Sequence, residues 1–134
     1  MDVVVTVPKS FGLQTWIDEG DAAGDPPSRW QLEWDFYLGG ARPNIKKGER
    51  VYVVYNGALR GYSPLVRIDI DPYERWRFSL VRHFDAVAVT IPEFIRGFRG
   101  WRYRWWNTSM EVPFPTWRDE NACIGFVRPD KAGA

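Results

Sequence analysis

The stretch from Arg96 to Trp106 holds the side chains whose types and spacing are best suited to ligand chemistry. It contains four arginines, five aromatic residues and no acidic residue. Stacking a nucleic-acid base on an aromatic ring is worth ~1–3 kcal/mol, and arginines add salt-dependent phosphate contacts. We therefore predict a nucleic-acid-binding surface here. Its candidate residues are Arg99, Trp101, Arg102, Tyr103 and Arg104.

The same stretch also fits a structural role. In a strand, Arg99, Trp101, Tyr103 and Trp105 would share one face, because side chains alternate along a strand. The rings would then fill the core while the arginine stems extend along it into solvent. A third reading is a protein–protein interface, because Trp, Tyr and Arg are enriched in interface hot spots.

A second aromatic group precedes the basic middle of the chain. Trp16 lies in a predicted helix, and Trp30 begins a predicted strand. Either ring could form one wall of a pocket for an extruded base, which in one version of the hypothesis is modified. Rings at this spacing also serve as core, so that alternative stays open.

Side chains for catalysis are few. Lys9, which follows the first predicted strand, is the one candidate for a catalytic base. His83 and Cys123 are the only histidine and the only cysteine, too few ligands for a metal site. We therefore expect no metal and no cofactor.

Charge is unevenly distributed along the 134 residues, although the net charge is only +1. Residues 42–104 carry a net charge of +7, residues 1–41 carry −5 and residues 105–134 carry −1. A basic middle between acidic ends can direct an anion to one face of a protein. A nucleic acid or a nucleotide is therefore the expected partner.

Length and composition indicate one globular domain over residues 1–134. The single cysteine excludes an internal disulfide, which fits a reducing compartment. No segment approaches the ~20 apolar residues of a membrane span, and the N-terminus lacks the basic region of a signal peptide. We therefore expect a cytoplasmic protein without a membrane partner.

Periodicity and turn residues predict a β-rich chain with one early helix. The helix is expected from Ser10 to Gly20, after a valine-rich strand from Asp2 to Pro8. The strongest signal is the dipeptide Asn56-Gly57 between two apolar runs, which predicts a hairpin. The predicted fold is α+β, a small pseudo-barrel of about six or seven strands, with a twisted open sheet as the alternative. The remaining predicted strands cover residues 30–38, 51–55, 58–70, 76–81, 86–91, 98–106 and 122–127.

This order of elements resembles the PUA-like superfamily, which includes the PUA, ASCH and EVE domains. The resemblance rests on Lys47-Gly48-Glu49-Arg50-Val51-Tyr52, which enters a strand, and on Leu59-Arg60-Gly61-Tyr62 in the next strand. Gly48 can take the left-handed conformation before a strand. Gly61, in the middle of a strand, permits a bulge or the close approach of another backbone.

The resemblance implies a pseudo-barrel with a ligand cleft beside the first helix. Members of this superfamily bind RNA or recognise a modified base in an aromatic pocket, and some ASCH-like members hydrolyse nucleosides or RNA. Asp18-Glu19-Gly20-Asp21 stands where ASCH domains carry a G-x-K-x-x-E-x-R segment, which counts against hydrolase activity. A non-catalytic nucleic-acid-binding module is therefore the leading hypothesis. An ASCH-like hydrolase that uses Lys9 and a protein-interaction domain are the alternatives.

Overall fold

The computed structural model describes residues 1–12, 33–83 and 86–129. Its named elements are strands, apart from the short 3₁₀ helix η1 (Thr108–Met110). The helix predicted from Ser10 to Gly20 falls mainly outside the described residues, and its described beginning is a turn in which the Phe11 amide donates to the Pro8 carbonyl. The β-rich character is therefore confirmed, while no N-terminal helix is found in the described part of that segment. None of the described helices has the length and apolar character that crossing a membrane would require.

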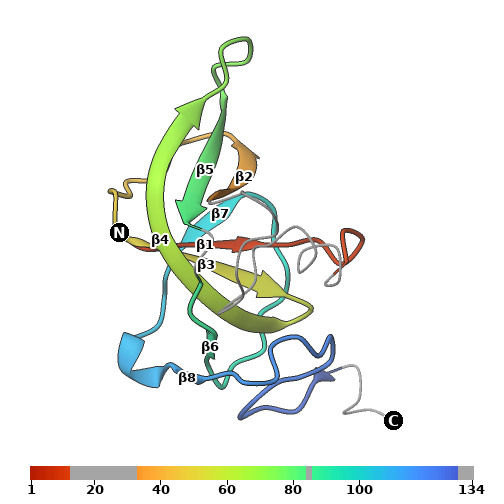
Figure 1. The fold of residues 1–134 in the computed structure, drawn as a ribbon. Coiled ribbons are helices and arrows are strands. Elements are labelled where there is room, and N and C mark those ends of the chain that lie inside the picture. Colours follow the sequence, from red (N-terminus) through yellow and green to blue (C-terminus); the bar gives the residue numbers. More distant parts are fainter. Residues whose placement is uncertain (13–32, 84–85, 130–134) are drawn as a thin grey trace.

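Six strands form one curled sheet in the order β2-β5-β4-β3-β1-β7 (Figure 1). Neighbours are antiparallel, except that β1 and β3 are parallel. These strands are β1 (Val3–Thr6), β2 (Glu33–Gly39), β3 (Arg50–Tyr55), β4 (Ala58–Ile70), β5 (Arg77–His83) and β7 (Trp101–Tyr103). Two further strands, β6 (Val89–Thr90) and β8 (Val112–Pro113), form a separate antiparallel pair.

Strand β4 curls the sheet, because its thirteen residues bend along their length (Figure 1). Its first half pairs with β3 and its second half with β5. The pairing register shifts once in each half, between Tyr52 and Val54 and between Leu65 and Arg67. Such bulges bend a strand and increase its twist. The result is a half-barrel, in which β2 and β7 are the two outer strands of the sheet.

The predicted Asn-Gly hairpin is confirmed between β3 and β4. Asn56 and Gly57 have φ angles of 48° and 82°, the positive values that a type I′ turn requires. The close backbone approach predicted at Gly61 is also present. Its φ is 124°, and the next residue, Tyr62, exchanges two backbone hydrogen bonds of 3.1 and 2.7 Å with Val87.

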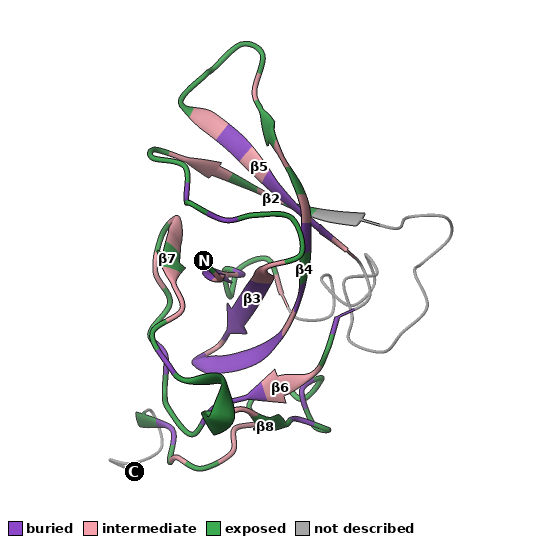
Figure 2. Cartoon of the chain, turned by 90° about the vertical axis from the view of Figure 1, so that its left-hand side faces the viewer, coloured by how far each residue is buried: buried purple, intermediate pink, exposed green. Residues whose placement is uncertain are grey.

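The centre of the sheet is buried on both faces (Figure 2). Alternation places Val51 and Val53 in a larger core, and Tyr52 and Val54 in a smaller core on the opposite face. A strand covered on both sides needs an almost continuous apolar run, which is what the valine-rich sequences of β1 and β3 supply. Ile91 and Ile95, which follow β6, and Trp106, which follows β7, belong to this smaller core.

The C-terminal third differs most from the prediction. Residues 122–127 form no strand, so that prediction is wrong, and residues 112–113, predicted as loop, form β8. The strand predicted over residues 98–106 shortens to β7, and the one over 86–91 shortens to β6. These segments are shaped by contacts to distant parts of the chain, which leave little signal in local periodicity.

Candidate functional site

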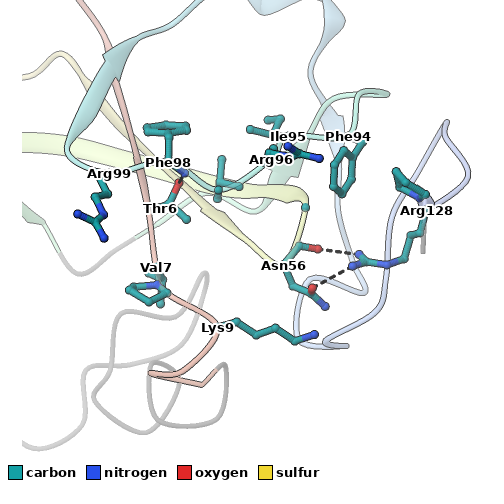
Figure 3. A pocket seen from close by; sticks show the side chains of 15 residues that line it. Thr6, Val7, Lys9, Asn56, Phe94, Ile95, Arg96, Phe98, Arg99 and Arg128 are labelled. Atoms are coloured by element: carbon teal, nitrogen blue, oxygen red, sulfur yellow. Dashed lines mark hydrogen bonds between the residues drawn. The ribbon is translucent and has the colours of Figure 1, made fainter. Parts of the chain in front are cut away.

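A pocket of about 1040 Å³ opens where the end of β1 meets the β3–β4 turn (Figure 3). Residues 6–9 form one side, Asn56 and Gly57 a second, residues 94–99 a third, and Arg128 with Pro129 a fourth. Sites that bury a small organic ligand have volumes of about 300–1,000 Å³. The pocket is therefore large enough for a nucleotide unit.

Four cationic side chains line the pocket, and the lining residues that the structure describes include no carboxylate. Lys9, Arg96 and Arg99 are exposed, while Arg128 is buried. In Figure 3, Arg99 and Arg128 lie on opposite sides of the pocket, with Lys9 extending below Asn56. Like charges gathered in a cleft raise the local concentration of anions, because the low-dielectric walls focus the field.

The inner wall of the pocket is apolar and partly aromatic, with side chains from Val54, Phe94, Ile95 and Phe98. The Ile95 amide donates to the Gly57 carbonyl at 2.9 Å, which ties this wall to the hairpin turn. The Phe94 ring packs directly over Gly57, where a Cβ would lie 2.4 Å from the ring. Glycine at this position therefore permits the positive φ of the turn and also leaves room for the Phe94 ring to pack against it.

The fourth wall is held by two buried arginines. Arg60, which is 1% exposed, donates to the carbonyls of Tyr55, Asp119 and Glu120 at 3.0, 2.8 and 2.8 Å, and also to that of Trp117. Its guanidinium therefore joins strand β4 to the chain segment that leads to the pocket. Hydrogen bonds from a charged donor are roughly twice as strong as neutral ones.

Asn56 links this segment to Arg128. Its side-chain amide donates to the Glu120 carbonyl at 2.8 Å, while Arg128 donates to the Asn56 carbonyl at 2.7 Å and to its side-chain oxygen at 2.9 Å. Burial, followed by the neighbouring Arg128 charge, lowers the pKa of Arg60 to about 10. The Arg60 guanidinium is therefore still protonated at neutral pH. The two hydrogen bonds to Asn56 orient Arg128 before any ligand arrives.

The sequence-predicted residues divide between the pocket and strand β7. Lys9 and Arg99 line the pocket, although they are ninety residues apart in the chain. Arg102 is exposed on β7, and its guanidinium carbon lies 4.3 Å from the centre of the Phe98 ring. Arg104 is paired with Asp2 at 3.0 Å, so its charge is largely neutralised.

Trp101 and Tyr103 are half-buried and pack against the larger core with their rings 4.7 Å apart. The indole nitrogen of Trp101 donates to the Ala41 carbonyl at 2.7 Å, and the Tyr103 hydroxyl accepts from the Asn44 amide at 2.9 Å. Their polar atoms are thus occupied by the chain before β3, and packing uses much of their ring surface. Trp16 and Trp30, the other predicted pocket residues, lie outside the described residues.

Among the charged and aromatic residues of the pocket, sequence reasoning missed Arg96, Phe98, Phe94 and Arg128. Arg96 belongs to the arginine-rich stretch, so composition alone could have placed it among the candidates. Phe94 and Arg128 carry no local signal, because only the tertiary structure brings them to the hairpin turn. In the described ranges, no group of three or more His, Cys, Asp and Glu side chains could hold a metal ion.

The arrangement suits a ligand that combines negative charge with a flat apolar group. The cations at the edge of the pocket can donate to phosphate or carboxylate oxygens, and the aromatic wall offers ring surface to a base. Comparison of the chain with protein-family models, with curated proteins and with solved structures found no match.

Proposed function

We propose that this chain is a nucleic-acid-binding module whose pocket receives one nucleotide unit of the strand. The observation that supports this most is the gathering of Lys9, Arg96, Arg99 and Arg128 around an aromatic wall, with no carboxylate among the described lining residues. Phosphate would contact the cations, and the base would lie against Phe94 or Phe98. The protein would thus bind its ligand without catalysing a reaction.

We also infer a PUA-like pseudo-barrel, formed as a single domain by residues 1–134. The parallel pairing of the valine strand β1 with β3 and the backbone contact at Gly61 are consistent with this assignment. The pocket at the end of β1 lies next to the start of the predicted first helix, where the resemblance places the ligand cleft. In a narrower version of the proposal, the bound base is modified.

Binding of a labelled single-stranded oligonucleotide, followed by fluorescence anisotropy between about 50 and about 200 mM salt, tests the proposal. The logarithm of the affinity should fall against the logarithm of the salt concentration with a slope near −2, because each phosphate contact of the three exposed cations, Lys9, Arg96 and Arg99, contributes about −0.7 on a single strand. Repeating the titration with modified bases tests the narrower version.

The double variant R96Q/R99Q should bind about 10- to 50-fold more weakly at about 0.1 M salt. Its salt dependence should be shallower, with the magnitude of the slope reduced by about 1.4. Both residues are exposed, so the fold should be retained. The matched control is R75Q, which removes an exposed arginine from the hairpin between β4 and β5. The proposal is wrong if the wild type does not bind, or if R75Q weakens binding as much as R96Q/R99Q.

A second candidate function is protein interaction, and one surface favours it. The β4–β5 hairpin and the adjoining β2 expose three aromatic side chains: Tyr73 at 94%, Trp76 at 56% and Tyr37 at 50%. Aromatic side chains of this kind commonly anchor protein interfaces. Size-exclusion chromatography at two protein concentrations checks for self-association, and salt-independent association without oligonucleotide binding would favour this candidate.

A further inference from the structure

A second aromatic surface adjoins the pocket through Phe98. The Phe98 ring lines the pocket, and it also contacts Arg102 and Trp105. The Phe98 and Trp105 rings are 6.5 Å apart with an interplanar angle of 69°. Trp105 is 43% exposed and Arg102 is exposed, so both flat groups present surface to solvent.

Trp105 is held in place from two sides. Its indole nitrogen donates to a carboxylate oxygen of Glu93 at 2.7 Å, and its ring meets that of Trp106 edge-on at 5.0 Å. Trp106 is buried, and its own indole nitrogen donates to Glu111 at 2.9 Å. A ring fixed in this way loses little conformational freedom when a ligand stacks on it.

Glu111 connects Trp106 to strand β3 by hydrogen bonds. Its carboxylate, whose side chain is 7% exposed, also accepts from the Tyr52 hydroxyl at 2.5 Å and from Arg50 at 3.0 Å. Burial, and then the hydrogen bond to Glu111, raises the pKa of Tyr52, so this hydroxyl stays protonated and donates at neutral pH. These contacts connect the stacking platform, which consists of the Trp105 ring and the Arg102 guanidinium beside Phe98, to strand β3 through Trp106 and Glu111. The platform is therefore formed without a ligand.

We propose, on the basis of the proposed function, that Trp105 and Arg102 form a second nucleotide subsite and that the ligand is single-stranded. The Phe98 and Trp105 rings are inclined at 69°, so bases stacked on them could not lie parallel as neighbouring bases do in a duplex, which fits bases that are separated from each other. Separated bases stack on aromatic rings and on guanidinium planes. A duplex keeps its base faces covered and cannot use such a platform.

In this arrangement one nucleotide occupies the pocket and its neighbour stacks on Trp105. Arg102, whose guanidinium lies over the Phe98 ring, is the cation available to the connecting phosphate. Glu93 accepts the indole N–H, so the second phosphate is expected on the Arg102 side of the ring, away from that carboxylate. A free mononucleotide would fill the pocket alone.

The test compares thymidine 5′-monophosphate, the dinucleotide and the trinucleotide with a duplex of the same sequence, using calorimetry or displacement of a labelled oligonucleotide. The wild type should gain about 5- to 100-fold in affinity from the mononucleotide to the dinucleotide, which is the effect of one stacked base. W105A should lose most of this gain and bind the mononucleotide like the wild type. W76A, which removes another exposed tryptophan, is the matched control and should keep the gain.

The outcomes separate this inference from the proposed function. Equal affinity of the wild type for all single-stranded lengths, together with weaker binding by R96Q/R99Q, would overturn the second subsite and leave the pocket in place. Duplex binding as tight as single-strand binding would overturn it as well. Absence of any binding, or binding unaffected by R96Q/R99Q, would contradict the pocket itself. If a circular-dichroism melt shows that W105A does not fold, the exposed residue Arg102 is tested instead with the variant R102A. The second subsite is then overturned if R102A shows the same increase in affinity from mononucleotide to dinucleotide as the wild type.

Discussion

Replacing Gly61 with alanine should lower the free energy of unfolding by about 2 to 5 kcal/mol. An alanine Cβ at this position would lie 2.3 Å from the Val87 carbonyl oxygen and 3.2 Å from its carbon. The φ of 124° adds a cost in backbone conformational energy, because residues with a side chain rarely adopt that value. The obstacle is backbone, and Val87 is held by two hydrogen bonds to Tyr62, so no rotamer change can relieve the overlap.

Gly48→Ala is the control that separates the steric overlap at position 61 from the cost of its unfavourable φ. Gly48 has a φ of 90°, but nothing lies within 4 Å of the position that an alanine Cβ would take, so only the conformational cost of ~1–2 kcal/mol applies. Urea unfolding of both variants gives the comparison, with a change of midpoint at an unchanged m-value as the expected behaviour. Equal losses at the two positions would contradict a stabilising role for the close approach between β4 and residue 87.

Arg60→Ala should destabilise the fold by about 2 to 4 kcal/mol and also weaken oligonucleotide binding. The variant loses hydrogen bonds to four backbone carbonyls and leaves a cavity where the guanidinium was buried. The loss is smaller than four charged hydrogen bonds would give, because burying this cation already costs free energy, as its lowered pKa indicates. Binding should weaken because Arg60 holds the segment that leads to Arg128.

Arg82→Ala provides the matched comparison. Arg82 is also 1% exposed and donates to a backbone carbonyl, that of Val51 at 2.9 Å, but it lines no part of the pocket. Both variants should unfold at lower urea concentration than the wild type. At a temperature where both are folded, only Arg60→Ala should show reduced oligonucleotide affinity. Equal affinities for the two folded variants would mean that the C-terminal wall does not contribute to binding.

The arginine- and aromatic-rich stretch shows how far composition can be used to predict a site. Its composition predicts residues that act together on one surface, but neighbouring side chains have different surroundings. Arg99 reaches the pocket, Arg104 pairs with Asp2, and Trp101 packs against the core. Only three residues of the stretch are in a strand, so the alternation assumed for a longer strand does not apply to its ends.

The sequence pattern was sufficient to predict local structure wherever a short segment determines its own conformation. The Asn56-Gly57 turn, the extent of β4 and the buried valine strand β1 follow from turn chemistry and from side-chain alternation, which act over a few residues. The need for glycine at position 61 was visible for the same reason, although the backbone it approaches was not.

The pocket was decided by the tertiary structure. It brings Lys9, Asn56, Arg99 and Arg128 together from four separate segments. The positions of Asn56 and Arg128 depend on hydrogen bonds that cross long stretches of chain. The carbonyl of Glu120, just before residues 122–127, likewise accepts hydrogen bonds from the distant side chains of Asn56 and Arg60. Local propensity cannot encode such contacts, since their free energy arises only when the distant partners have already been folded into place.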